Sequence, residues 1–133
     1  MTVTPGLVGE ARRLVKPSML ASAIGSGSLE VFATPALVAL MELAACAALE
    51  GHLEPGQTSV GIQVDIAHLA ATPPGVEVRA RAELVEVDGR RLVFRVEAFD
   101  PQDRIGEGTH ERALVDPERL LARANAKRTP SSA

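Results

Sequence analysis

The sequence predicts an α+β protein in which an antiparallel sheet of about five strands wraps around one long buried helix. An apolar run from Thr34 to Glu50 has the end signals of a helix and almost no polar face. Beyond this run, apolar and polar residues alternate, as they do in strands that bury one face. Short turn sequences separate the alternating segments, and such short connections join antiparallel strands.

The composition fits a single domain over residues 1–133. With 133 residues, 46% of them hydrophobic, the chain can form one core but hardly a second. Only 2% of the residues are aromatic, so Val, Leu, Ile and Ala must fill that core. The lack of aromatic stacking surfaces and the net charge of −3 argue against nucleic-acid binding.

The single cysteine, Cys46, excludes an internal disulfide and a cysteine-based metal site. Because it lies in an apolar run, we expect a buried, unreactive thiol. The N-terminus has no charged segment followed by an apolar one, so no signal peptide is expected. The longest apolar stretch, Pro35 to Leu49, is too short to span a bilayer and carries Glu42. We therefore expect a cytoplasmic protein that does not associate with membranes.

The first strand is expected from Gly6 to Val15, and Lys16 with Pro17 ends it. The segment from Met19 to Val31 is rich in small residues and has no clear period, and Gly25 to Ser28 within it reads as a loop. No further strand or helix is expected before the long apolar run.

The long helix is expected to begin at Thr34, whose hydroxyl would cap the first turn, with Pro35 at the first helical position. It ends before Gly51, a residue type common just beyond a helix C-cap. Since the helix is apolar nearly all round, protein must surround it.

Four strands are expected after a turn at residues 52–57, with turn signals at residues 72–75, 88–89 and 100–103 between them. The side chains expected to face the helix are Val60, Ile62, Val64 and Ile66, then Val76, Val78, Ala80, Ala82 and Leu84, then Leu92, Phe94, Val96 and Ala98. The last strand runs from Ile105 to Val115. Asp116 and Pro117 then start a short helix to about Ala124, and a flexible tail is expected from about residue 125. This is the hotdog architecture, and its free sheet edges favour dimerisation.

Three side chains in this arrangement are candidates for chemistry. Glu42 stands in the middle of the apolar helix and needs a partner or a cavity, because an unpaired buried carboxylate is unfavourable. Thr34 precedes it by about two turns, and His68 continues the inward parity of the neighbouring strand. Taken alone, Thr34 is more simply a helix cap, and a histidine on an apolar strand face is more often structural.

Together, the three groups suit acyl transfer. The carboxylate can attack an acyl carbonyl, or activate the hydroxyl or a water molecule. The imidazole can orient the carboxylate or give a proton to the leaving group. A backbone N–H near Gly61 can hold the developing oxyanion, because glycine permits close approach. His110 and Arg112 share one face of the last strand, and two interpretations stay open: a solvated strand with a salt bridge to Glu107 or Glu111, or an arginine pointing into a cleft.

Four segments resemble the fluoroacetyl-CoA thioesterase family of hotdog proteins: VFATPALVALMELAAC, VGIQVDIAHLAATPPG, VDGRRLVFRVEAFD and IGEGTHERALVD. The resemblance runs from about Val31 to the terminal helix, and HLAATPPG and GTHER are its most specific motifs. It implies that the catalytic threonine, glutamate and histidine of the family correspond to Thr34, Glu42 and His68. The glycine beside the bound thioester corresponds to Gly61, and the arginine on the substrate side to Arg112.

The resemblance further implies hydrolysis of a short-chain acyl-CoA without a metal or cofactor, in a homodimer with its active site at or near the subunit interface. Association of two dimers into a tetramer, and whether Glu42 or Thr34 is the first nucleophile, are left open. The family's fluoroacetyl-specific enzyme has a phenylalanine-containing lid, whereas this chain has LASAIGSGSLE without Phe, so we expect weak fluoroacetyl selectivity. The alternatives are a non-catalytic acyl-CoA or small-ligand binding protein and, third, a hotdog hydratase.

Overall fold

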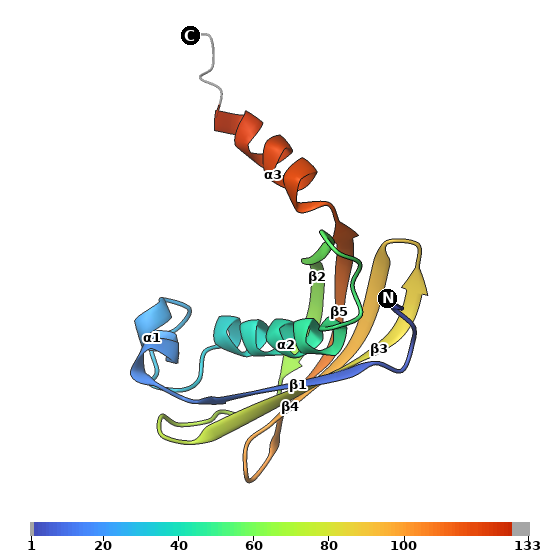
Figure 1. Cartoon of the computed structure of the whole chain (residues 1–133). Helices are drawn as coiled ribbons and strands as arrows, with labels where there is room; N and C mark the ends of the chain where they lie inside the picture. The colour runs from blue at the N-terminus through green and yellow to red at the C-terminus, as the bar shows by residue number, and fades with distance from the viewer. Residues whose placement is uncertain (1, 129–133) are drawn as a thin grey trace.

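A computed structural model describes residues 2–128 and shows a five-stranded antiparallel sheet with one long helix against it (Figure 1). The strand order is β1-β3-β4-β5-β2, so β1 and β2 form the two edges. This arrangement confirms the predicted α+β hotdog fold. The elements in chain order are β1 (Val8–Leu14), η1 (Pro17–Met19), α1 (Ala21–Ile24), α2 (Thr34–Leu49), β2 (Thr58–His68), β3 (Glu77–Asp88), β4 (Arg91–Phe99), β5 (Arg104–Val115), α3 (Pro117–Asn125) and η2 (Ala126–Arg128).

Helix α2 lies directly on the sheet because the contact residues are small. A Cβ atom at Gly9 of β1 would overlap the carbonyl of Ala44 and the amide of Ala48. At Gly106 of β5, a Cβ would come within 2.9 Å of the Leu37 side chain. The inward-facing residues of β3 and β4 are fully buried beneath the helix, as predicted: Val78, Ala80, Ala82, Leu84, Leu92, Phe94, Val96 and Ala98.

The start of α2 differs from the prediction in one respect. Ala33, in extended conformation, is the N-cap and makes no side-chain cap bond, while Thr34 is the first residue of the helix. The Thr34 hydroxyl therefore does not cap the helix, and it hydrogen-bonds to His68 instead. The end of α2 is as predicted, since Gly51 lies just beyond the C-cap with a left-handed φ of 81°.

One face of α2 has no protein over it in the single chain. Leu43 is 38% exposed, and Cys46, which we expected to be buried, is exposed as well. The expectation was wrong because the sheet covers only one side of the helix. Leu43 and Cys46 are therefore apolar side chains exposed on the side of α2 that faces away from the sheet.

Strand β2 contains a β-bulge between Gly61 and Gln63, and this bulge changes which side chains face the helix. Beyond the bulge the predicted parity holds, and His68 pairs with Gly106 on the helix side. Before the bulge the alternation of side chains is shifted by one residue. Gly61 therefore faces the helix, and its neighbours Val60 and Ile62, which were predicted to face it, do not. Ile62 is 53% exposed.

The structure adds three short helical segments to the prediction: η1, α1 and η2. The four-residue α1 follows η1 in the segment expected to be irregular, and residues 25–28 form the expected loop. Helix α3 begins where predicted, with the Asp116 side chain accepting from the backbone amides of Glu118 and Arg119. It projects away from the sheet (Figure 1) and has no buried residue. Of the expected flexible tail, residues 126–128 form η2, and 129–133 lie outside the described residues. Within residues 2–128, no helix has the length and apolarity needed to cross a bilayer.

The loop after β2 is tied to the segment before α2 through Thr72. Its buried hydroxyl donates to Oδ2 of Asp100 at 2.8 Å, and its carbonyl accepts from the amide of Phe32 at 2.8 Å. Asp100 also accepts from the amides of Gln102 and Asp103 in the β4–β5 turn. Thr72 therefore connects that turn to the residues that lead into α2.

We predict that Thr72→Val lowers the free energy of unfolding by about 1–2 kcal/mol, because it keeps the packing and leaves the Asp100 carboxylate with one donor fewer. Chemical denaturation measures the change. Thr58→Val, at an exposed position of β2, is the matched control and should change stability by less than about 0.5 kcal/mol. An equal effect of both substitutions would mean that the Thr72–Asp100 bond contributes nothing specific.

Candidate active site

The first group of candidate residues joins the start of α2 to the end of β2. The Thr34 hydroxyl lies 2.8 Å from Nδ1 of His68. Burial lowers the pKa of His68 below its ordinary value, and the Ala70 backbone offsets this only in part. A neutral imidazole at this distance can accept the hydroxyl proton, so the pair has the geometry of a nucleophile and its general base.

Nε2 of His68 is buried and has no hydrogen-bond partner of ordinary geometry among the described residues. A buried polar atom without a partner is unfavourable and uncommon in folded proteins. A buried polar atom of this kind is expected where a substrate or a second protein chain supplies the missing partner.

The second group lies further along α2 and centres on Glu42. Oε2 of Glu42 is 3.5 Å from Nη1 of Arg112. Arg112 is only 6% exposed, and its orientation is set by Ser59, whose side-chain Oγ accepts from Nε at 2.8 Å and whose carbonyl accepts from Nη2 at 3.1 Å. The Glu42 side chain is 40% exposed, so its carboxylate has a buried cation on one side and access to solvent.

His110 completes this second group, and the sequence analysis did not assign it a role in the site. Its Nδ1 lies 2.8 Å from the carbonyl of Gln63, which requires a proton on Nδ1. In the neutral ring, Nε2 then accepts from Nη1 of Arg112 at 3.1 Å. Burial lowers the pKa of His110, the Gln63 carbonyl works in the opposite direction, and the charge of Arg112 lowers it further. His110 is therefore a neutral acceptor that positions Arg112.

These contacts decide between the two interpretations of the last strand. Both His110 and Arg112 are buried, so the solvated strand is wrong. The carboxylates proposed for that interpretation have other partners, because Glu107 pairs with Arg104 and Glu111 pairs with Arg91.

Gly61 supplies the space that the Glu42 carboxylate occupies. A Cβ atom at this position would lie 2.5 Å from Oε2 of Glu42 and 3.2 Å from Cε1 of His110. Because the carboxylate ends a flexible side chain, a larger residue would displace Glu42 from Arg112 rather than unfold the strand. The bulge after Gly61 places this glycine on the helix side.

The structure thus brings Thr34 to His68, and Glu42 to Gly61 and Arg112, but it keeps the two groups apart within one chain. Thr34 and Glu42 are separated by about 12 Å along the helix axis at 1.5 Å per residue. Among residues 2–128, no group of His, Cys, Asp or Glu side chains is arranged to hold a metal ion. The sequence signal for His110 was its shared face with Arg112, which the spacing alone could not interpret.

Residues 15–118 match the family model described as "Fluoroacetyl-CoA-specific thioesterase". A fluoroacetyl-CoA thioesterase from Streptantibioticus cattleyicolor is 50% identical over 102 residues, which cover 77% of this chain and 73% of that protein. A solved structure of a fluoroacetyl-CoA thioesterase superposes with a TM-score of 0.89 at 39% identity, covering 98% of this chain and 100% of the other. A thioesterase superfamily member from Thermus thermophilus gives 0.85 at 30% identity, covering 95% and 96%.

The two buried histidines predict a pH dependence of stability. Their pKa values are lowered in the folded state, so the unfolded chain binds more protons just below the ordinary histidine value. Stability should therefore be complete above about pH 6.5 and should decrease as the pH falls through the lowered values. Urea unfolding at about pH 7.5 and about pH 5 measures this loss. His110→Gln should reduce the difference between the free energies of unfolding measured at these two pH values. If that difference is unchanged in both His110→Gln and His68→Gln, the assignment of the pH dependence to these histidines is refuted.

Proposed function

The chain belongs to the fluoroacetyl-CoA-specific thioesterase family and is a thioester hydrolase, and we propose that it cleaves a short-chain acyl-CoA to the free acid and CoA. The observation that carries this proposal is the neutral Thr34–His68 pair, together with a carboxylate held by a buried arginine above a glycine. A cytoplasmic location suits such a substrate, since CoA thioesters are intracellular metabolites.

We assign the steps of hydrolysis to these groups as follows. The Thr34 oxygen attacks the thioester carbonyl while its proton moves to His68, and the protonated imidazole then gives that proton to the departing CoA sulfur. Glu42 takes a proton from a water molecule, whose oxygen attacks the acyl carbonyl of the acyl-threonine. The carbon–oxygen bond to Thr34 then breaks, the Thr34 oxygen receives the proton held by Glu42, and the acid is released. Arg112 and the backbone at Gly61 lie on the substrate side, where they stabilise the negative oxygen of the intermediate.

We propose a homodimer that pairs through the β2 edge. This edge strand exposes two apolar side chains, with Ile62 at 53% and Val64 at 40% exposure. The bare face of α2, with Leu43 and Cys46, is the other apolar surface that a single chain leaves open. A second copy placed across the edge would hydrogen-bond to β2 and cover apolar surface at the same time.

Such a dimer would also unite the two groups of catalytic residues. In an antiparallel pair of β2 strands related by a two-fold axis, an axis at Asp65 sets His68 of one chain opposite the bulge that contains Gly61 in the other. Both residues lie on the helix side of the sheet. We propose that each active site combines the Thr34–His68 pair of one subunit with Glu42, Gly61 and Arg112 of the other.

We propose that the acyl group is short and that fluorine is not strongly selected. The segment Met19 to Glu30 contains no phenylalanine. The next phenylalanine, Phe32, is only 2% exposed and belongs to the core, so it cannot close over an acyl group.

The first prediction from this proposal is release of free thiol from acyl-CoAs between acetyl and hexanoyl, with less than about tenfold preference for fluoroacetyl-CoA over acetyl-CoA in kcat/KM. Glu42→Gln should lower kcat about 10²-fold, the usual scale for acid–base assistance. Glu50→Gln, an exposed carboxylate at the end of the same helix, is the matched control and should keep full activity. A thiol reagent measures turnover, and thermal unfolding confirms that the variants are folded.

The same assay separates the alternatives. Tight binding of an acyl-CoA without thiol release would identify a binding protein. Loss of an enoyl-CoA without thiol release would identify a hydratase. Full activity in folded Glu42→Gln protein would eliminate the mechanism.

The shared active site predicts complementation between inactive variants. Glu42→Gln and His68→Asn proteins should each be nearly inactive. After mixing and subunit exchange, about half of the dimers contain one copy of each variant, and each of these has one intact site, so about a quarter of wild-type activity should return. No recovery in dimers shown by mass spectrometry to be mixed would place all catalytic residues within one chain.

A further inference from the structure

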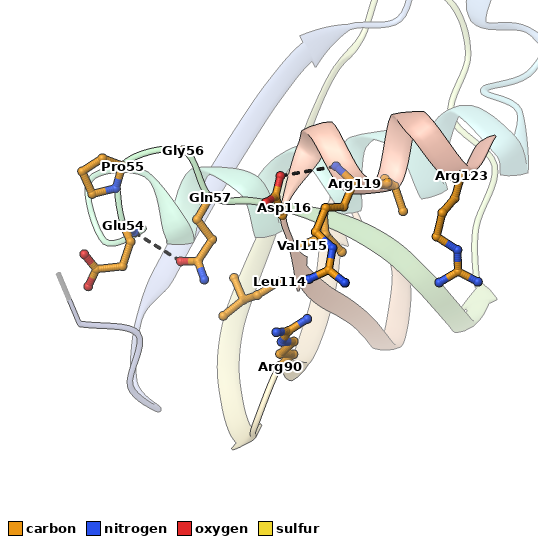
Figure 2. A pocket seen from close by; sticks show the side chains of 11 residues that line it. Glu54, Pro55, Gly56, Gln57, Arg90, Leu114, Val115, Asp116, Arg119 and Arg123 are labelled. Carbon is orange, nitrogen blue, oxygen red and sulfur yellow. Dashed lines mark hydrogen bonds between the residues drawn. The ribbon is translucent and has the colours of Figure 1, made fainter. Parts of the chain in front are cut away.

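A hollow lies at the C-terminal end of β5, where α3 leaves the sheet (Figure 2). It has a volume of about 480 Å³ and is formed by the loop between α2 and β2, the β3–β4 turn, the end of β5 and the first turns of α3. None of the steps assigned above uses it.

Three arginines line this hollow. Arg119 and Arg123 are one turn apart on α3 and therefore share a face, and Arg90 comes from the β3–β4 turn. In Figure 2 the side chains of Arg119 and Arg123 leave α3 on the side where the Arg90 side chain lies. Segments distant in the sequence thus place three positive charges around one space.

These arginines differ from most others in the protein. Seven arginines form ion pairs with carboxylates: Arg12, Arg79, Arg81, Arg91, Arg95, Arg104 and Arg112. Within residues 2–128, Arg90, Arg119 and Arg123 form no such pair. Three cations that converge without a carboxylate partner, in a chain of net charge −3, mark a local site for an anion.

The two carboxylates that line the hollow do not neutralise it. Asp116 is engaged in capping α3, where it accepts from the amides of Glu118 and Arg119. Glu54 lies at the opposite end of the hollow from Arg123 in Figure 2. The rest of the lining includes the apolar side chains of Pro55, Leu114 and Leu120. Guanidinium groups beside an apolar surface suit a phosphorylated nucleoside better than a simple inorganic anion.

The position of the hollow relates it to the proposed substrate. Leu114 follows Arg112 on the same face of β5, about 7 Å further along the strand. Arg123 lies about 9 Å along the helix axis from the first residue of α3. The hollow therefore begins next to the arginine at the acyl end of the site and leads away from it, as the arm of an extended CoA molecule would.

We propose that Arg90, Arg119 and Arg123 bind the phosphate groups of the CoA part of the substrate, with the adenosine against Leu114 and Leu120. This inference rests on the proposed function, because it assigns the nucleotide end of the same substrate. Helix α3 is then a binding element, which explains why an arginine-bearing helix is held clear of the sheet.

The test compares two thioesters of the same acyl group, one on CoA and one on pantetheine, which lacks the nucleotide phosphates. In the double variant Arg119→Gln, Arg123→Gln, the ratio of kcat/KM for the CoA thioester to that for the pantetheine thioester should fall about tenfold, because each exposed charge pair contributes modestly. The matched control is Arg95→Gln, Arg128→Gln, which removes the same charge outside the hollow and should leave the ratio unchanged. An unchanged ratio in the first variant would overturn the inference while leaving the thioesterase function intact.

Calorimetry provides a readout that does not need turnover. Adenosine 3′,5′-bisphosphate should bind the wild type, compete with acyl-CoA, and bind the Arg119→Gln, Arg123→Gln protein about tenfold more weakly. If no acyl-CoA is hydrolysed but this loss is seen, the phosphate site stands and the proposed function fails. Equal affinity in both proteins, or binding of inorganic phosphate without competition against acyl-CoA, would show that the hollow does not hold the nucleotide end of the substrate.

Discussion

The close contact between α2 and the sheet is the constraint on which the site depends. The backbone of α2 occupies the position that a side chain at Gly9 would need. The Leu37 side chain occupies the position that a side chain at Gly106 would need. Because interiors are packed at high density, this contact leaves little freedom in the position or rotation of the helix. Thr34 and Glu42 are carried on that helix, so their positions over β2 and β5 follow from where the small residues lie.

The buried polar groups beneath α2 form one connected set. Arg112 is held by Ser59, by neutral His110 and by Glu42, and His110 is held by the Gln63 carbonyl in the bulged strand. Each contact satisfies a group that would be unfavourable if buried alone. The β-bulge matters for chemistry because it brings both Gly61 and the Gln63 carbonyl to this set.

The proposed dimer, in which each active site draws residues from both subunits, would account for the apolar surface that a single chain leaves exposed. Within one chain Arg112 is fully held, yet Nε2 of His68 has no hydrogen-bond partner of ordinary geometry among the described residues, and the β2 edge exposes Ile62. A fold with an open edge and a helix bare on one side can share its active site with a second copy without any insertion. In the nucleotide site that we propose, helix α3, with Arg119 and Arg123 on one face, would extend the substrate contact beyond the sheet.

Local patterns in the sequence were enough to predict the fold and the face of the sheet on which His68 lies. The period of two in β3 and β4, the Asp88-Gly89 turn and the apolar run closed by Gly51 each report a conformation set by neighbouring residues, and each is present in the structure. The parity of His68 likewise followed from its own strand. What tertiary structure decided were the contacts between distant segments: the bulge that turned Gly61 inward, the Thr34 hydroxyl bonded to His68 rather than to its own helix, the exposure of Cys46 and the role of His110. No period encodes these features, because each depends on which part of the chain lies opposite and how closely the helix approaches it.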